Sequence, residues 1–238
     1  MLMTRAHPLR DLVDEFDSYE IDKHFPDLMA APGAARVDYY KNVLNELPEA
    51  YRGSGTRMAN YLARDLDELF RWLRSDAFAA AIEDGGKTWF GRMNELDGDL
   101  YTGNVYEVTG LVQGDTQPSE CAVLLVERLE VTPELEAEFD AWVEEVHLPA
   151  YEGAAGVGRV RSGRAIREGI PLPYYYSLGN RVVLVEVAGD DPRVPLLSNR
   201  MLAALADSVR WDLRLPYVRR DVYALLCSAD ADTGGGDA

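Results

Sequence analysis

Two histidines, His24 and His147, are the first candidates for chemistry, because their surroundings in the sequence match. An imidazole titrates near neutral pH, so it can move protons without a cofactor. Each histidine precedes a proline by two residues, and Pro26 and Pro149 are expected to limit the helices there. A histidine near a helix C-terminus also favours the helix dipole and bonds the last carbonyl groups. A catalytic and a structural interpretation therefore both remain open for each histidine.

Glu186 is the third candidate, because it interrupts the apolar run VVLVEVA (182–188), which has the pattern of a buried strand. A buried carboxylate must be paired or have a raised pKa, which is what a general acid or base requires. We predict that Glu186 acts as the partner acid or base of a histidine. The alternative is that Glu186 faces solvent or pairs with an arginine such as Arg181.

Tyrosine is frequent, with 13 copies, and several copies are clustered. A phenol combines apolar area with one polar tip, which suits an aromatic or polyketide-like ligand, although core packing is the more ordinary use. We expect Tyr61 to hydrogen-bond an enolate oxygen. The residues expected to line the pocket for a small hydrophobic molecule are Asn60, Tyr40, Trp89, Tyr101 and Tyr176.

Other kinds of site find little support. Three histidines, at positions 7, 24 and 147, have no local metal-binding spacing, and the sequence has no G-x-S-x-G elbow and no useful phosphate-binding glycine loop. We expect no metal and no cofactor. Haem held by one histidine stays open, since an axial ligand and a capping imidazole look alike in a sequence.

Composition narrows the class of protein. The formal net charge of −17 argues against nucleic acid and anionic membranes as partners. Two cysteines, Cys121 and Cys227, are too few for a disulfide framework. No apolar run reaches the roughly 18 residues of a membrane-spanning helix, and no signal peptide is recognised. We expect a soluble, cytoplasmic protein.

An internal repeat organises the chain. Residues 15–43 align with residues 138–166 without a gap, at the offset that separates His24 from His147, and nine of these 29 positions are identical. The match resumes with two added residues, which places Tyr61 opposite Glu186. Near the ends of the copies, NVYEV (104–108) parallels DVYAL (221–225).

Each copy is predicted to have the order strand, helix, strand, strand, helix, strand. Asp65 and Glu68 form a plausible capping box for the second helix, which is expected to break near Ser75. The predicted fold is α+β, with two tandem ferredoxin-like βαββαβ repeats packed sheet to sheet as an intramolecular dimeric α/β barrel. The expected units are a first repeat (1–109), a linker (110–120), a second repeat (121–227) and a disordered tail (228–238).

The first copy resembles the EthD family of the dimeric α/β-barrel superfamily. The resemblance rests on His24-Phe25-Pro26, Pro32-Gly33, Arg36, Tyr40, Leu47-Pro48, Tyr51-x-Gly53 and the run MANYLARDLDELFRWLRSDAFAAAIEDG. The second copy keeps His147-Leu148-Pro149, Gly156 and Arg159, but its second helix departs, with Pro192 and Pro195 near its start. The resemblance implies the fold and an apolar pocket, in a superfamily of cyclases, decarboxylases, isomerases, quinone-forming monooxygenases and haem enzymes.

The leading hypothesis is a cofactor-independent biosynthetic enzyme that cyclises, isomerises, dehydrates or decarboxylates a small hydrophobic, polyketide-like substrate by acid/base catalysis. The proposed catalytic residues are His24, His147, Glu186 and Tyr61. Alternatives are a haem-binding or cofactor-free oxygenase and a non-catalytic binding or stress-response protein. The chain is expected to be a monomeric pseudo-dimer or a homodimer.

Overall fold

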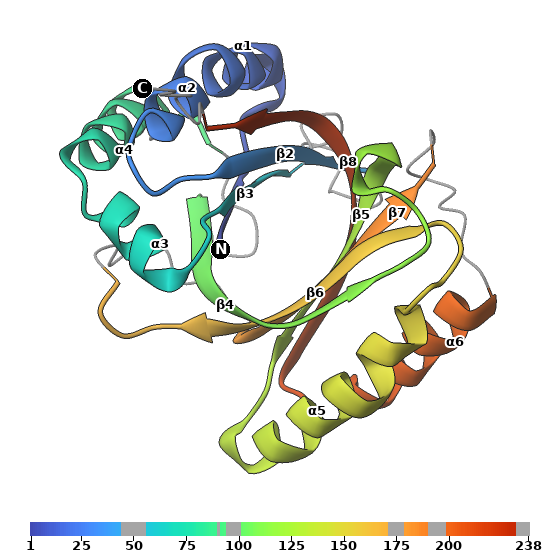
Figure 1. Ribbon diagram of the computed structural model, residues 1–238. Helices are drawn as coiled ribbons and strands as arrows, with labels where there is room; N and C mark the ends of the chain where they lie inside the picture. Colours follow the sequence, from blue (N-terminus) through green and yellow to red (C-terminus); the bar gives the residue numbers. More distant parts are fainter. Residues whose placement is uncertain (44–55, 90, 94–100, 171–178, 190–198, 232–238) are drawn as a thin grey trace, which may run out of the picture.

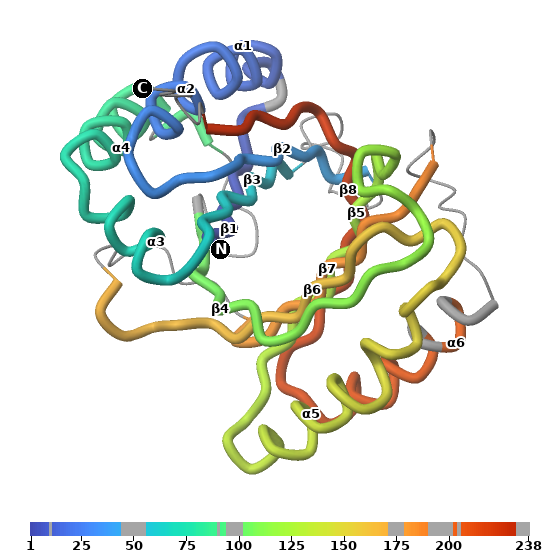
Figure 2. The backbone as a smooth tube through the Cα atoms, in the orientation of Figure 1, coloured from blue at the N-terminus to red at the C-terminus, as the bar shows by residue number. Residues whose placement is uncertain are grey.

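The described strands form a closed antiparallel barrel, as a computed structural model of the chain shows (Figures 1 and 2). The structure describes residues 1–43, 56–89, 91–93, 101–170, 179–189 and 199–231. Around the barrel the strands follow the order β1-β3-β2-β8-β5-β7-β6-β4, and β4 pairs with β1. Their bounds are Leu2–Ala6 (β1), Arg36–Asn42 (β2), Arg57–Leu62 (β3), Tyr101–Gln113 (β4), Cys121–Glu130 (β5), Val157–Ile166 (β6), Arg181–Ala188 (β7) and Tyr217–Asp230 (β8).

Each half of the chain supplies four neighbouring strands of this circle. The first half is ordered β4-β1-β3-β2 and the second half β8-β5-β7-β6. Two antiparallel seams join the halves, one between β2 and β8 and one between β4 and β6. The predicted α+β barrel is therefore confirmed, whereas its origin in tandem ferredoxin-like repeats stays a prediction.

Helices cover the outside of the barrel on two sides, one for each half (Figure 1). None of the described helices has both the length and the apolar character needed to cross a membrane. The helices are α1 (Val13–Tyr19), α2 (Phe25–Met29), α3 (Leu66–Leu73) and α4 (Asp76–Trp89) in the first half, and α5 (Glu136–Trp142) and α6 (Asn199–Ser208) in the second.

The core has three layers, because successive strand residues face opposite sides of the sheet. Leu2 packs under the helices of the first half, Leu125 packs under those of the second half, and Met3 lies between them inside the barrel. Apolar residues of the inner layer include Met1, Met3, Tyr40, Met58, Tyr106, Leu124, Val126, Val182, Leu184 and Tyr223. The sheet thus separates an interior from two helix-covered faces.

The pairing registers of the two halves correct one part of the sequence alignment. Leu2 pairs with Tyr61, and its counterpart Leu125 pairs with Val185. Tyr61 therefore corresponds to Val185, and the predicted match of Tyr61 with Glu186 is wrong. Tyr61 faces the helices, whereas Glu186 faces the interior, since shifting a strand by one residue exchanges its two faces.

A π-helical turn follows the first helix of each half, at Glu20–His24 and at Val143–His147. The N–H of Phe25 bonds the carbonyl of Glu20 across this widened turn. Pro26, which has no N–H to give, then sits in the first turn of a new helix rather than inside an old one. In the first half the chain thus stays helical through Pro26 to Met29, further than the proline predicts.

Helix α3 begins and ends where the sequence predicts a cap and a break. Asp65 is the N-cap of α3, and its Oδ1 accepts from the N–H of Glu68 at 2.8 Å. The predicted break is also present, because α3 ends before Ser75, whose Oγ accepts from the N–H of Phe78 at the start of α4. Both predictions are confirmed.

Two strands run past the predicted segment limits. β4 continues to Gln113, beyond the start of the predicted linker at residue 110, and β8 continues to Asp230, within the predicted tail. The added length of both strands pairs across the seams, where Gln113 faces Arg159 and Asp230 faces Arg36. Residues 232–238 of the predicted tail lie outside the described residues.

The turn before β2 offers a test of the packing between this turn and α3. Gly33 has φ +110°, and a Cβ placed there would overlap the carbonyl oxygen of Glu68. We expect Gly33→Ala to lower the free energy of unfolding by about 2 to 4 kcal/mol, through strain and the clash. Gly86→Ala, in an open position of α4, is the control and should be neutral or stabilising. Equal denaturant midpoints for the two variants would contradict this packing.

Candidate functional site

The two predicted histidines occupy equivalent positions, each the last residue of a π-helical turn and each buried beneath an aromatic ring. His24 stacks on Tyr19, with ring centroids 5.7 Å apart and an interplanar angle of 24°. His147 stacks on Trp142, with values of 4.5 Å and 29°. The structure therefore repeats the histidine–aromatic pair in both halves.

Each of these aromatic rings is hydrogen-bonded to an aspartate on another helix of its own half, α4 in the first half and α6 in the second. The hydroxyl of Tyr19 donates to Asp84 at 2.8 Å, and Nε1 of Trp142 donates to Asp207 at 2.5 Å. These bonds fix the two helices of each half against one another. The shared arrangement supports the structural interpretation of both histidines, while their catalytic role stays a prediction.

Among the described residues, His147 forms an ion-pair contact with a carboxylate, whereas His24 does not. Nε2 of His147 lies 3.3 Å from Oε2 of Glu127, which projects from β5 toward the helices. Ser208 and Arg220 donate to Oε1 of Glu127 at 2.9 and 2.7 Å. In the first half the position of Glu127 is taken by Thr4, so His24 lacks this partner. Burial lowers the pKa of His24 to about 4, which keeps its ring neutral at pH 7.

The surroundings of the two imidazole rings leave no room for a haem group to bind either ring as an axial ligand. His147 is 1% exposed and lies between Trp142, Tyr151 and Glu127, and His24 is 4% exposed beneath Tyr19. A porphyrin at His147 would have to displace these packed side chains. The described residues around the two rings therefore do not fit the haem alternative.

Glu186 lies inside the barrel and is held by two arginines. Its carboxylate accepts from Arg159 at 3.2 Å and forms a second ion pair with Arg161, both on the neighbouring strand β6. The solvent-facing alternative does not hold, and the arginine partners differ from the expected Arg181, which pairs with Asp140 instead. Its two ion pairs support a structural role for Glu186, while its catalytic role stays a prediction.

Tyr61 and Trp89 belong to the aromatic core beneath the first-half helices. The ring of Tyr61 lies 5.2 Å from that of Trp72. Trp89 meets Phe16 edge to face at 5.0 Å, and the guanidinium of Arg92 covers its face at 4.3 Å. The rings are packed against one another, which is the more ordinary use of aromatic residues.

The remaining predicted residues are not gathered with the histidines. Tyr40 and Asn60 project into the barrel, so the sheet separates them from His24. Tyr101 pairs through its backbone with Ala6 at the start of β4, and Tyr176 lies outside the described residues. The predicted site set is thus divided between the interior and the two outer faces.

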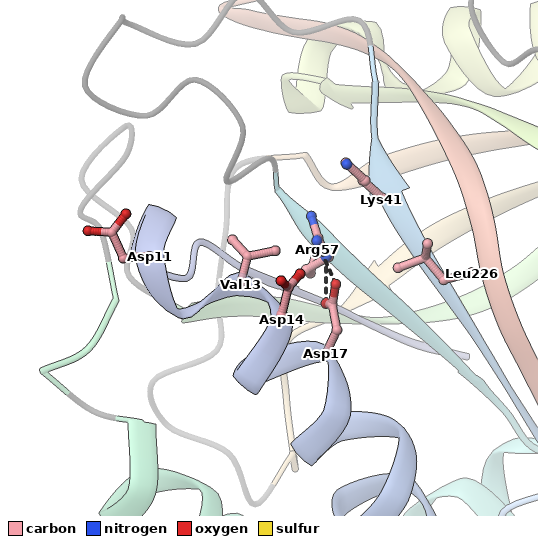
Figure 3. A pocket seen from close by; sticks show the side chains of 7 residues that line it. All are labelled: Asp11, Val13, Asp14, Asp17, Lys41, Arg57 and Leu226. Atoms are coloured by element: carbon pink, nitrogen blue, oxygen red, sulfur yellow. Dashed lines mark hydrogen bonds and ion pairs between the residues drawn. The ribbon is translucent and has the colours of Figure 1, made fainter.

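A cavity of about 390 Å³ opens between α1 and the adjoining strands of the first half, at a place that the sequence predictions missed (Figure 3). Its lining residues are Asp11, Val13, Asp14, Asp17, Lys41, Arg57 and Leu226. Asp17 and Arg57 face each other at its floor and form a two-pronged ion pair, with distances of 2.7 and 2.6 Å. Tyr39 donates a further hydrogen bond of 2.7 Å to Asp17.

Three carboxylates at three-residue spacing form a row along this helix. Asp14 and Asp17 line the cavity, and Glu20 continues the row one helical turn further, where it is 6% exposed. The spacing is visible in the sequence, but the pairing of Asp17 with Arg57 and the burial of Glu20 are tertiary effects. No group of three metal-binding side chains occurs among the residues that the structure describes.

Glu20 has a pKa that suits it to acid–base catalysis near neutral pH. Burial raises the pKa of its carboxyl to about 8, and the negative charge of Asp17 adds to the effect. At pH 7 Glu20 is therefore mostly a neutral acid, close to its midpoint. A group poised in this way can give or take a proton with little cost, as acid–base catalysis requires.

Comparison with known proteins gives a fold and no family. No protein-family model and no curated protein matches the sequence. Similar solved structures include the following three. An anthrone oxidase-like protein has a TM-score of 0.62 at 12% identity, over 100% of this chain and 95% of that chain. A candidate monooxygenase of Fusobacterium nucleatum has a TM-score of 0.59 at 11% identity, over 96% and 93%.

A second candidate monooxygenase, from Lactobacillus acidophilus, has a TM-score of 0.56 at 11% identity, over 97% of this chain and 95% of that chain. At such low identity these likenesses show the fold alone. The chain thus shares with these proteins the fold of a closed antiparallel barrel. Its closer resemblance to the EthD family stays a prediction.

The raised pKa of Glu20 predicts a pH dependence of stability. Below pH 4.5 the carboxyl is protonated in both states, and between 4.5 and about 8 the folded state keeps a proton that the unfolded state has lost. Stability should therefore fall as pH rises through this window. In Glu20→Gln that fall should be smaller by on the order of 3 to 5 kcal/mol.

Urea unfolding at pH 5, 6, 7, 8 and 9 measures this difference. The exposed Glu144→Gln is the matched control, because it also removes one carboxyl from a π-helical turn, and it should follow the wild type. Parallel curves for the wild type and Glu20→Gln would show that Glu20 has an ordinary pKa.

Proposed function

We propose that the chain is an enzyme that removes a proton from a small, enolisable molecule in the first-half cavity, and that molecular oxygen then oxidises the resulting carbanion. One observation carries this proposal: a buried carboxyl with a pKa of about 8, one helical turn from a cavity of about 390 Å³. Pockets of roughly 300 to 1,000 Å³ are typical of small-molecule sites. Oxygen enters because the fold is shared with proteins named as candidate monooxygenases and as anthrone oxidase-like.

The cavity has groups for both ends of such a substrate. Val13 and Leu226 offer apolar contact on opposite walls, and Lys41 and Arg57 provide positive charge (Figure 3). The charge of Arg57 is shared with Asp17, whereas Lys41 has no ion-pair partner among the described residues. Lys41 is therefore the better group to stabilise a negative oxygen that develops on the substrate.

In the proposed reaction, a carbon activated by a carbonyl group, directly or through an aromatic ring, loses a proton. The proton passes by way of Asp17, which lines the cavity, to the carboxylate form of Glu20, which is buried behind it. The electron pair of the C–H bond moves onto the carbonyl oxygen, and the ammonium of Lys41 stabilises the enolate. Oxygen then oxidises this carbon, so that a methylene group and O₂ give a carbonyl group and water. Proton removal also begins enolisation, isomerisation and cyclisation, so the first step does not depend on the oxidant.

The two halves differ at the groups that this reaction needs. Asp17 and Arg57 recur in the second half as the ion pair of Asp140 and Arg181, whereas the position of Glu20 holds Val143. Shared strand order, register and π-helical turns support the further proposal that the halves are tandem ferredoxin-like copies. On that basis one copy has kept an acid–base group and the other has only the supporting ion pair.

Carbon-acid exchange tests the first step with anthrone as the probe. Under argon in D₂O, the wild type should speed exchange of the methylene hydrogens. Glu20→Gln should slow this catalysed exchange by roughly 100-fold or more. The catalysed rate should rise with pH to a plateau above about 8 in the wild type, because the base must be ionised. Glu144→Gln, whose side chain is exposed in the second half, should exchange anthrone at the wild-type rate.

Admitting air to the same samples tests the oxidation. Formation of the quinone and uptake of one O₂ per product should follow the exchange rate across the variants, without added flavin, haem or metal. Exchange without quinone would restrict the activity to isomerisation or cyclisation. A rise in melting temperature with anthrone but no exchange above the buffer rate would indicate a binding protein and refute the proposal.

A further inference from the structure

Three arginines lie together at one end of the barrel interior. Arg5 on β1 and Arg128 on β5 occupy equivalent positions in the two halves, paired with Met58 and Val182, which also face inward. β1 and β5 stand opposite each other, with three strands between them on either side of the circle. Arg219 on β8 pairs with Arg128 and completes the group. Duplication of the fold has thus set two buried cations face to face.

The guanidinium of Arg128 is only partly used. Its side chain is fully buried, and Nη2 donates to Asp221 at 3.2 Å. Nε and Nη1 are also buried and make no hydrogen bond within the part of the chain that the structure describes. Asp221 is shared with Arg219, whose Nε lies 3.1 Å from Oδ2. Buried donors left without an acceptor are costly, so an acceptor is expected between these side chains.

The surroundings suit a small anion. An eight-stranded barrel has room inside for side chains or for one small ligand. The ring of Tyr217 lies 5.9 Å from the guanidinium of Arg128, and the fully buried Tyr106 and Tyr223 lie nearby on β4 and β8. Burial and the charge of Arg128 lower the pKa of Arg5, which records the mutual repulsion of the two cations. A bound negative charge would relieve that repulsion.

We infer that this end of the barrel interior binds one small oxyanion, a carboxylate or a phosphate, between Arg5 and Arg128. Nε and Nη1 of Arg128 are the buried donors left for such an anion, and Nε forms the parallel donor pair of the guanidinium together with Nη2. The site is separate from the first-half cavity, because Arg5 and its cross-strand partner Met58 face the interior, while the next residue of β3, Arg57, faces the helices. A ligand there would contact strands of both halves and hold them together.

Thermal unfolding in sodium phosphate, sodium acetate and sodium chloride at equal ionic strength and pH tests the site. One of the two oxyanions should raise the melting temperature of the wild type in a saturable way, by about 5 °C at 100 times its Kd. Phosphate alone or acetate alone identifies which oxyanion the site prefers. Arg128→Met should abolish the rise, and the exposed Arg64→Met should retain it.

Calorimetric titration of the folded wild type gives a second measurement that does not depend on how well Arg128→Met folds. It should show one site per chain for the stabilising anion. Arg128→Lys, which keeps the charge but loses the two-pronged donor, should bind at least 10-fold more weakly. No saturable binding of either oxyanion, or equal affinity in Arg128→Lys, would overturn the inference.

Discussion

Closure of the barrel is the constraint on which the other features depend. Each half alone would leave two sheet edges unpaired, and each edge finds its partner in the other half, β2 with β8 and β4 with β6. Closure also creates an interior. In that interior each half alone would bury charged side chains without their partners, at a high cost in free energy. Glu186, Arg128 and Asp221 are buried there because strands from several parts of the chain bring their partners within reach. The barrel can therefore bury charged side chains in its interior because the two seams close it.

The two halves show which contacts the fold repeats and which it does not. The ion pair of Asp17 and Arg57 recurs, as do the inward arginines and the histidine–aromatic stacks. Glu20 does not recur. The repeated contacts lie between helices and sheet or inside the barrel, so they serve packing in both halves. An acid–base group that occurs in one half alone does not belong to this shared packing, and its cost in stability needs another explanation.

Much of the architecture could be predicted from residue identities and spacing. The offset between His24 and His147 located two equivalent helical turns, and Asp65 marked the start of α3. The face of Glu186 could not be predicted, because a one-residue error in aligning the third strands inverts every side chain. Nor could the buried environment of Glu20 be predicted, since it depends on tertiary neighbours such as Tyr39, which approaches the helix from β2. Local patterns specify elements, whereas pKa values and cavities arise from tertiary contacts.

The β-bulge in β8 places a residue of the second half in the wall of the first-half cavity. Between Tyr39 and Tyr40 the register of β2 with β8 slips, and Leu226 is the extra residue that opposes neither. That residue forms one wall of a cavity whose other lining residues all come from the first half. Strand β8, from the second half, therefore helps to form a cavity whose other walls come from the first half. A substitution at Leu226, in the second half, would therefore change the shape of a cavity that is otherwise lined by the first half.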